Sequence, residues 1–441
     1  MRTPSDTIAA IATAPGGAIG IIRLSGPRAR EIAAKHFKPW PQELSARRFV
    51  IGWWHDAEGN RLDHGMAVGM EGPRSYTGED VVELHLHGGA TNLARCLRVC
   101  LTAGARPAEP GEFTRRAFLN GKMDLTRAEA VADMIAASTD QALVHARRHL
   151  EGRLYREANT LRERILALAA QVEVNIDFVE EDVPVIDPHR LGSDIREVSD
   201  TIGRLLATFT EGRLLREGAR VVISGPPNAG KSTLFNALVG QSRAIVTPHA
   251  GTTRDVIEAG IDCGGVPLTL VDTAGIRETG DEVERIGVDR ARDEAAQADL
   301  VIGVIDGLGA RSLGQIDTRC PTVWVMTKAD LTDAAPPPGA QAISATTGQG
   351  LERLREELLS RLGASGRDGA SLVVSRERHR DALQITQEAL LRAATALEEH
   401  REPELVSVDL QDAITALSEL VGLTTIEDVL DQLFSSFCIG K

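Results

Sequence analysis

A glycine-rich segment near the middle of the chain carries the residue types that hold a nucleoside triphosphate. Gly225 is followed by Pro-Pro-Asn-Ala and then by Gly230-Lys231-Ser232, which matches the spacing GxxxxGK(S/T). In such a loop, backbone N–H groups bind phosphate oxygens at a helix N-terminus, the lysine reaches the β- and γ-phosphates, and the serine hydroxyl binds Mg²⁺. The apolar run 221–224 precedes the loop and predicts the strand that this motif requires. We therefore predict a phosphate-binding loop over residues 225–232.

An aspartate after a later apolar run adds a second contact to the same nucleotide. Asp272-Thr273-Ala274-Gly275 follows the predicted strand 268–271. An aspartate at a strand end can contact Mg²⁺ through its water shell, and the N–H of Gly275 can meet the γ-phosphate. The DxxG pattern is common in loops, so it indicates a nucleotide contact only because of its position after the phosphate-binding loop.

A third segment predicts that the base is guanine. Thr327-Lys328-Ala329-Asp330 follows a further apolar run, and the Asp330 carboxylate can accept hydrogen bonds from guanine N1–H and N2–H₂, which adenine does not offer. The stem of Lys328 packs on the base. The usual motif is NKxD, and Thr327 supplies a hydroxyl where Asn would supply an amide. Ser344-Ala345-Thr346 completes the base pocket through backbone contacts, so we predict GTP rather than ATP.

These motifs leave open how the attacking water is positioned. Gly251-Thr252-Thr253-Arg254-Asp255 lies between the loop and Asp272, where a threonine can bind Mg²⁺ once a γ-phosphate is present. Ile276 follows Gly275, where a Ras-like GTPase has the glutamine that orients water. Isoleucine cannot orient water, so help must come from an acid in the segment 281–285 or from a cation.

The elements around these motifs predict an inserted α/β domain. Apolar runs alternate with helical stretches, which predicts a mostly parallel sheet with helices on both faces; the runs are 221–224, 268–271, 300–305 and 322–326. Helical patterns with few Gly or Pro stand on either side, at 126–178, 191–216 and 375–441. Neither helical half is self-sufficient, so we expect the second to pack on the first.

The first part of the chain has a different pattern of apolar residues. Short apolar runs at 19–24 and 81–86 predict strands, and 28–37 and 92–103 predict short helices, which together indicate an α+β domain. The predicted fold is therefore a multidomain α/β plus α protein. We place its domain boundaries at 1–121, 122–216, 217–371 and 372–441.

Composition excludes several other classes of protein. The 441 residues include 42% apolar and 25% charged residues, which is ordinary for globular domains, and the net charge of −14 argues against coating nucleic acid by bulk charge. The five cysteines are scattered and odd in number, which indicates reduced thiols in a cytosolic setting without structural zinc. No apolar run of about 18 residues occurs, so we predict no membrane-spanning helix and no membrane partner.

Several runs identify a family. The runs GPPNAGKS, GTTRD and DTAGIRETGDEVERIG and the terminal Cys438-Ile439-Gly440-Lys441 closely resemble the MnmE (TrmE) family, the GTPases that modify a uridine in tRNA. Three N-terminal runs are similar to it too, namely DTIAA from Asp6, YTGED from Tyr76 and LNGKMDL from Leu119. The resemblance spans the whole chain, whereas other translation-factor-type GTPases share only its middle.

The resemblance implies a fold and an activity. Its fold would be an N-terminal tetrahydrofolate-binding domain that forms a homodimer, a split helical domain and an inserted GTPase domain, in a cytoplasmic protein. The implied partner is an MnmG-type flavoprotein that uses FAD and NADH and joins it in a heterotetramer. Together they would add a carboxymethylaminomethyl-type group to C5 of the wobble uridine of certain tRNAs, with a tetrahydrofolate one-carbon donor. GTP hydrolysis would follow dimerisation of the two GTPase domains.

The resemblance also implies how hydrolysis works without a glutamine. Potassium, held by Asn228, would take the place of an arginine finger, and Thr247, His249 and Thr252 match the other potassium positions. Glu284 matches the catalytic acid that orients water, and Ser232 and Thr253 match the Mg²⁺ ligands. The full predicted GTP site is Asn228, Ala229, Gly230, Lys231, Ser232, Thr233, Thr247, Pro248, His249, Ala250, Gly251, Thr252, Thr253, Asp272, Thr273, Ala274, Gly275, Thr327, Lys328, Asp330, Ser344 and Ala345.

The implied folate site lies at the two ends of the chain. Its positions match Arg23, Glu83, Lys122 and the terminal Lys441. Cations can bind the glutamate tail of a folate, and a carboxylate can pair with the N–H donors of a pterin. Cys438 stands beside Lys441 in sequence, and its thiolate could act as a nucleophile in the modification.

A second class of function competes with this one. A ribosome- or RNA-binding assembly factor would use the same GTPase motifs as a switch, without folate chemistry. Such a factor usually carries an appended basic domain, and the extra segments of this chain form an α+β domain and acidic helices. Binding of tetrahydrofolate distinguishes the two classes.

Overall fold

The computed structural model describes most of the chain and divides it into two compact units. The described residues are 6–14, 16–40, 47–177, 187–242, 244–245, 257–272, 294, 296–309, 320–364, 373–424 and 427–441. One unit joins Met1–Ala132 to Ser418–Lys441, and the other is Asp133–Leu417. The first and last segments of the chain therefore fold together.

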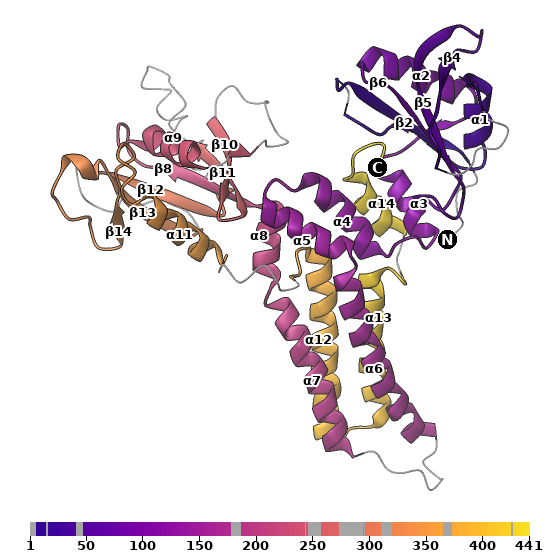
Figure 1. Cartoon of the computed structure of the whole chain (residues 1–441). Helices are drawn as coiled ribbons and strands as arrows, with labels where there is room; N and C mark the ends of the chain where they lie inside the picture. The colour runs from indigo at the N-terminus through magenta and orange to yellow at the C-terminus, as the bar shows by residue number, and fades with distance from the viewer. Residues whose placement is uncertain are drawn as a thin grey trace. The chain divides into compact units, whose positions relative to one another are not determined.

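The first unit is built on a mostly antiparallel sheet, in which only β1 and β7 pair in parallel among the described strands, with α1 and α2 on one face. Among the described residues the sheet has seven strands in the order β3-β4-β5-β6-β2-β1-β7 (Figure 1). Its strands are β1 (Ile8–Ile11), β2 (Ile19–Ser25), β3 (Phe37–Lys38), β4 (Val50–His55), β5 (Arg61–Met70), β6 (Val81–His87) and β7 (Arg106–Pro107). Its helices are α1 (Ala29–His36), α2 (Ala90–Thr102), α3 (Glu112–Leu119) and α14 (Glu427–Ser435), while α4 (Leu125–Ala136) begins in it.

Alternation of side chains fixes which face of this sheet is the core. On β6, Val82, Leu84 and Leu86 are buried with residues of α1 and α2. Glu83 and His85 stand between them in the sequence and therefore lie on the opposite face. The predicted strands 19–24 and 81–86 and the helices 28–37 and 92–103 are confirmed, with shifts of one or two residues at their ends.

The second unit contains long helices that pack in pairs. They are α5 (Asp140–Leu150), α6 (Arg153–Asp177), α7 (Pro188–Leu206), α8 (Phe209–Glu217) and α12 (Glu377–Glu398), and α13 (Pro403–Val421) lies mostly within it. Helix α7 begins where Asp187 caps it by accepting a hydrogen bond from the His189 N–H, with proline as the first helical residue. Helices α7 and α12 lie side by side, and Gln387 donates to the Ser199 carbonyl at 3.3 Å. The two helical halves therefore do pack on each other, as the sequence predicts.

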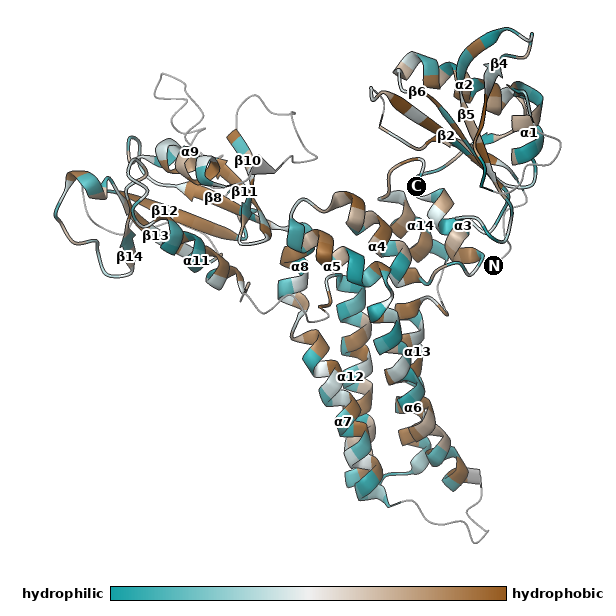
Figure 2. Ribbon diagram, in the orientation of Figure 1, coloured by the Kyte–Doolittle hydropathy of each residue, from teal (hydrophilic) through white to brown (hydrophobic). Residues whose placement is uncertain are grey.

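The inserted domain is a twisted sheet of the doubly wound kind. In the described residues its order is β14-β13-β12-β8-β11-β10-β9. The strands are β8 (Ala219–Ser224), β9 (Ala244–Ile245), β10 (Ile257–Cys263), β11 (Val266–Asp272), β12 (Leu300–Asp306), β13 (Thr322–Thr327) and β14 (Ala340–Ala342), with α9 (Lys231–Gln241), the 3₁₀ turn η2 (Ala329–Leu331) and α11 (Leu351–Leu362). Figure 2 shows β8, β11 and β12 in brown, as expected for strands covered on both faces.

The sheet is parallel except at one edge. Strands β11, β8, β12, β13 and β14 pair in parallel, whereas β10 pairs antiparallel with both β11 and β9. The architecture is an N-terminal α+β domain, a helical domain and an inserted P-loop GTPase domain. None of the helices in the described ranges combines the length and the apolar character needed to cross a bilayer.

Candidate functional site

The phosphate-binding loop lies where the sequence places it, between β8 and α9. The side chain of Lys231 is buried in the loop, and its Nζ donates to the carbonyls of Gly225 at 2.8 Å and Pro226 at 2.9 Å. Burial lowers the pKa of Lys231, and the negative charge of Asp272 acts in the opposite direction. The ammonium group is thus held inside the curve of the loop, where phosphate oxygens would meet it.

Asp272 and the first turn of α9 stand next to each other across the sheet. Asp272 is the last residue of β11 and pairs in register with Ile223 of β8, directly before the loop. Its side chain is buried, while Ser232 and Thr233 are exposed in the first turn of α9. A carboxylate and a hydroxyl on neighbouring elements fit the oxygen ligands and water contacts that Mg²⁺ requires.

Two residues of the base-recognition segment bind the phosphate-binding loop directly. Thr327 Oγ1 donates to the Ala229 carbonyl at 2.6 Å and lies 3.1 Å from the Ile305 carbonyl. Lys328 Nζ donates to the Asn228 carbonyl and to Asp306 Oδ2, both at 3.0 Å. The hydroxyl of Thr327 therefore provides a link between the base segment and the phosphate loop, although the usual asparagine is absent.

Asp330 lies on the 3₁₀ turn that follows this link. The turn is fixed by a bond from the Ala329 N–H to the Ile343 carbonyl at 3.1 Å, and Asp330 is exposed. Ser344 is buried and its hydroxyl accepts from the Thr347 N–H at 3.1 Å, which closes the loop around Ala345, while the Ala329–Ile343 bond holds the start of this loop beside the turn. The two predicted base-pocket segments thus meet at the carboxyl ends of β13 and β14.

Part of the predicted GTP site lies outside the described residues. The positions outside are Thr247, Pro248, His249, Ala250, Gly251, Thr252, Thr253, Thr273, Ala274 and Gly275, and the predicted catalytic acid Glu284 and Ile276 lie outside as well. Their roles therefore remain predictions.

Asp306 is a site residue that the sequence reasoning missed. It ends β12 and forms the ion pair with Lys328, and the Leu308 N–H and the Lys328 ammonium hold its pKa below the usual range. The signal was present, because Asp306 directly follows the apolar run 300–305 and the carboxyl ends of parallel strands form the ligand edge of such sheets. It holds the ammonium group of Lys328, which we predict to pack on the base.

The link through Thr327 predicts a measurable effect on nucleotide binding. Thr327→Val removes the hydroxyl and leaves the buried Ala229 carbonyl without this donor, so we expect GTP to bind about tenfold more weakly, or ~1.4 kcal/mol. Equilibrium titration with a fluorescent GTP analogue measures the change. Thr327→Ser keeps the hydroxyl and serves as control. Equal affinity of the valine and serine variants would contradict this role.

A second group of polar residues gathers in the first unit. On the face of the sheet away from α1 and α2, Arg23 Nε donates to Glu83 Oε1 at 2.8 Å. The Arg23 guanidinium lies over the rings of Tyr76 at 5.7 Å and Phe113 at 5.5 Å, and it donates to the Gly440 carbonyl at 3.2 Å. Arg23, Glu83 and the backbone of Gly440 are therefore brought together, and the assignment of a folate site to them stays a prediction.

The C-terminal residues are fixed in place by main-chain hydrogen bonds. The N–H of Gly111 donates to the Cys438 carbonyl at 3.4 Å and that of Phe113 to the Lys441 carbonyl at 3.1 Å. Gly440 has φ +93°, and a Cβ there would lie 2.4 Å from the Ile11 carbonyl oxygen, so only glycine fits. The Cys438 side chain is exposed.

Lys122 lies in a different part of the unit. Its Nζ donates to the Pro73 carbonyl at 2.8 Å, and its stem borders Gly78. No described hydrogen bond or ion pair joins Lys122 to Arg23 or Glu83. Its assignment to the folate site remains a prediction.

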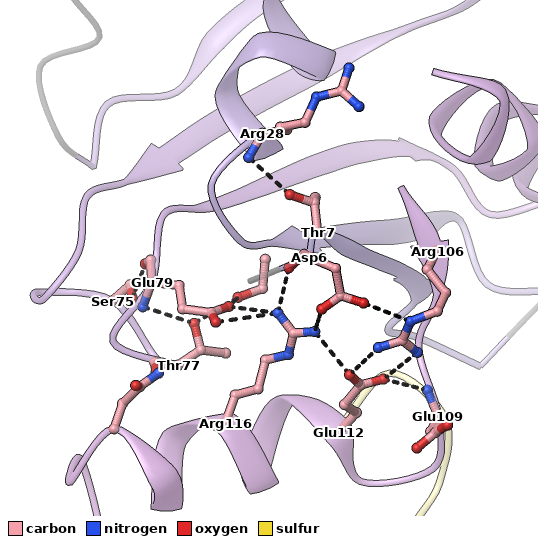
Figure 3. A network of polar contacts seen from close by, with 12 residues as sticks. Asp6, Thr7, Arg28, Ser75, Thr77, Glu79, Arg106, Glu109, Glu112 and Arg116 are labelled. Atoms are coloured by element: carbon pink, nitrogen blue, oxygen red, sulfur yellow. Dashed lines mark hydrogen bonds and ion pairs between the residues drawn. The ribbon is translucent and has the colours of Figure 1, made fainter. Parts of the chain in front are cut away.

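A partly buried ion network supports this region (Figure 3). Arg116 on α3 is fully buried and binds Asp6 Oδ1 at 2.7 Å, Glu112 Oε1 at 3.0 Å and Glu79 Oε2 at 3.1 Å. Arg106 on β7 binds the same Asp6 at 2.8 Å and Glu112 at 2.7 Å. Three carboxylates and two guanidinium groups thus tie α3 to the sheet edge and to the segment that carries Tyr76.

Comparison with known proteins assigns the chain to a family. A family model described as the MnmE helical domain matches residues 125–438, and one described as the GTP-binding protein TrmE N-terminus matches residues 7–122. Among solved structures, a single-residue variant of Aquifex aeolicus Era bound to GDP·AlF₄⁻ is 24% identical and covers 39% of this chain and 67% of its own, with a TM-score of 0.27. That score is too low to support an argument.

Full-length relatives are much more similar. The tRNA modification GTPase MnmE of Aquifex aeolicus is 44% identical and covers 100% of both chains. The proteins of the same name from Symbiobacterium thermophilum and Synechococcus are 44% and 45% identical, with 98–99% of each chain covered. The chain belongs to the MnmE family of tRNA modification GTPases.

Proposed function

We propose that this protein is a GTP hydrolase that acts in tRNA modification. The observation that carries the proposal is the direct connection between its two nucleotide motifs, in which Thr327 binds the Ala229 carbonyl and Lys328 binds the Asn228 carbonyl. This connection fixes the distance between the phosphate-binding loop and Asp330, so that one guanine nucleotide can occupy both.

We further propose that potassium activates hydrolysis. Asn228 would hold the ion together with the predicted positions Thr247, His249 and Thr252, while Ser232 and Thr253 bind Mg²⁺. The Asn228 main chain has φ +62° and is held by Lys328, which supports a fixed position for this residue in the loop. A cation beside the phosphates stabilises negative charge that develops on the transferred group.

The test is GTP turnover by the full chain in KCl and in NaCl at equal ionic strength. We expect turnover to be strongly faster in KCl, because the smaller sodium ion does not fill a site built for potassium. Choosing equal ionic strength removes general screening effects. Equal, slow rates in both salts would argue against the ion site and favour a switch GTPase that depends on a protein activator.

Glu284 is proposed as the residue that orients the attacking water. Its substitution Glu284→Ala should leave GTP affinity near normal and lower the hydrolysis rate by about 100-fold, the usual contribution of a positioned acid or base. Single-turnover hydrolysis together with a nucleotide titration measures both quantities. Glu282→Ala, in the same acidic segment, is the matched control. Retained hydrolysis in the Glu284 variant would remove this assignment.

We propose that the first unit binds a tetrahydrofolate one-carbon donor. Arg23, Glu83 and Lys441 would contact it, with Lys122 as the outlying position and Cys438 as a reactive thiol. The arginine held between two aromatic rings and paired with Glu83 supports this, since it presents a fixed cation and carboxylate to a ligand. Calorimetric titration of a reduced folate into the wild type and Glu83→Ala tests it. Identical binding by both proteins would exclude the carboxylate.

We propose the wider activity because the chain belongs to the MnmE family. A homodimer would bind an MnmG-type flavoprotein and carboxymethylaminomethylate C5 of the wobble uridine of tRNA in the cytoplasm. Exposed apolar side chains on the sheet of the first unit support a dimer surface there; they are Ile19, Phe49, Ile51 and Trp53. We retain the domain boundaries 1–121, 122–216, 217–371 and 372–441 as part of this proposal.

A further inference from the structure

The β10–β11 hairpin extends from the nucleotide site to a point of contact with the helical domain. Its ladder runs without interruption from the pair Ile257–Asp272 to the pair Cys263–Val266. At ~3.4 Å per residue these strands span about 20 Å. At one end of the hairpin, Asp272 pairs with Ile257, the first residue of β10. Ile257 follows the predicted Mg²⁺-binding Thr253 in sequence. Strand β11 is also held by β8 from Leu268 to Asp272, so β10, which lies nearer the edge of the sheet, is the strand that can carry a displacement from this end to the turn.

The turn of this hairpin binds the start of helix α5. Thr139 Oγ1 donates to the Gly265 carbonyl at 2.7 Å. The side chain of Gln141 packs so closely on Gly265 that a Cβ there would lie 2.2 Å from its Cδ. Gly265 also has φ +92°, so two separate requirements demand glycine at this contact. We call Thr139, Gln141 and Gly265 the turn contact.

The residue that donates this bond also starts the helix. Thr139 caps α5, since its Oγ1 accepts a hydrogen bond from the Ala142 N–H at 3.1 Å. Further along α5, the His149 Nε2 lies 2.9 Å from the carbonyl of Val373, in the segment that leads from the GTPase domain into α12. Helix α5 therefore contacts the GTPase domain at the hairpin turn and at its exit segment.

The hairpin turn borders an open pocket. A cavity of about 330 Å³ is bordered by the turn and by Gln241, Ser242 and Glu352. The turn is held internally by a bond from the Gly265 N–H to Asp262 Oδ1 at 2.7 Å. Closely packed interiors resist displacement, and a turn that borders a cavity can move without overlapping its neighbours. The turn therefore has adjacent space for a small displacement.

We propose that the turn contact transmits the state of the nucleotide to helix α5. The inference rests on the proposed GTP binding and adds a route by which it reaches the helical domain. In one nucleotide state the Thr139–Gly265 bond forms and the first turn of α5 is held; in the other the hairpin shifts, the bond breaks and that turn loosens. Nucleotide binding and the order of α5 are then coupled, and the coupling is reciprocal.

One pair of substitutions separates the contact from the helix cap. Thr139→Asp keeps a side-chain oxygen that accepts from the Ala142 N–H, and an aspartate suits a helix N-terminus, but it has no proton to donate to the Gly265 carbonyl. Thr139→Ser keeps both bonds and is the matched control. Gly265→Ala disturbs the contact from the other side and leaves the cap unchanged.

The measurement is amide hydrogen exchange over 140–150 in the full chain, with GDP and with a non-hydrolysable GTP analogue. In the wild type and Thr139→Ser we expect exchange to differ by about fivefold or more between the two nucleotides. In Thr139→Asp and Gly265→Ala we expect this difference to vanish while both nucleotides still bind. Because the coupling is reciprocal, the ratio of the two nucleotide affinities should change by no more than about fivefold.

The outcomes that overturn the proposal are distinct from failure of the proposed function. A wild type that binds both nucleotides but shows equal exchange over 140–150 would mean that the contact is a static interface. Persistence of the nucleotide-dependent difference in both Thr139→Asp and Gly265→Ala would mean that another route carries it. A wild type that binds neither nucleotide would instead contradict GTP binding itself.

Discussion

Asp330→Asn should reduce the affinity for GTP by about 100-fold or more and create affinity for xanthosine triphosphate. The carboxylate accepts from guanine N1–H and N2–H₂ through charge-assisted bonds, and an amide offers one oxygen and places N–H groups against the second donor. A hundredfold loss corresponds to ~2.7 kcal/mol. Xanthine carries a carbonyl in place of the 2-amino group, so the amide N–H of asparagine then finds an acceptor.

Competition titrations with GTP, xanthosine triphosphate and ATP measure this change in specificity. Asp333→Asn is the matched control, because Asp333 is also exposed and lies on the loop that follows the same 3₁₀ turn. Its nucleotide preference should equal that of the wild type. Unchanged preference for GTP in the Asp330 variant would show that another residue recognises the base.

Arg116→Met should unfold the first unit under conditions in which the wild type is stable. The methionine fills much of the volume but leaves Glu79 without its ion-pair partner, and it leaves Asp6 and Glu112 with Arg106 alone. Removing one partner from a buried ionic network costs about 3–5 kcal/mol, a large part of the stability of a domain. Urea unfolding of the full chain followed by tryptophan fluorescence measures it, since three of the four tryptophans lie in the first unit, at positions 40, 53 and 54.

Arg28→Ala is the control for that experiment. Arg28 pairs with Glu31 on the exposed surface of the same unit, where side chains are well solvated, so we expect no measurable change in unfolding. An Arg116 variant as stable as the wild type would show that the three acids take up protons or water instead.

The same network predicts an acid limit to stability. Burial raises the pKa of Glu112, but hydrogen bonds from Arg106, the Glu109 N–H and Arg116 outweigh it and hold that pKa below its usual value. Burial also raises the pKa of Asp6, but hydrogen bonds from Arg106 and Arg116 outweigh this effect, so the pKa of Asp6 is lowered too. A carboxyl group whose pKa is lower in the folded protein than in the unfolded protein stabilises the fold at any pH above its unfolded-state pKa. This stabilisation is lost as the pH falls through its folded-state pKa.

The GTPase domain could be predicted from sequence because its signals are local. A buried parallel strand is a short apolar run, and its motif residues follow it directly, so the order of residues alone places Lys231 and Asp272 on their elements. The antiparallel strand β10 was harder to predict from sequence, because it mixes Glu258 and Asp262 with apolar residues and does not form a continuous apolar run. The position of the central strands is set by burial on both faces, which the edge strand lacks.

The first unit depends on contacts that sequence patterns do not record. Nothing around Arg116 marks it as fully buried, since an arginine after Thr114 and Arg115 on a short helix is typical of an exposed face. The pairing of Arg23 with Glu83 follows from the register of β2 and β6, and strand register is decided by the whole sheet. The role of the Thr327 hydroxyl became visible only through its distance to Ala229.

The bond between Arg23 and Gly440 joins residues 417 positions apart, and it sets an order of events during synthesis. At about 5–20 residues per second a ribosome needs some 20–80 s to make that length of chain. Throughout that interval the emerging sheet of the first unit lacks the segment that lies against Ile11 and Phe113. Translation must therefore pass Gly440 before Arg23 can acquire its last partner, and a message cut short between 417 and 440 yields chains that contain the whole second unit but an incomplete first unit.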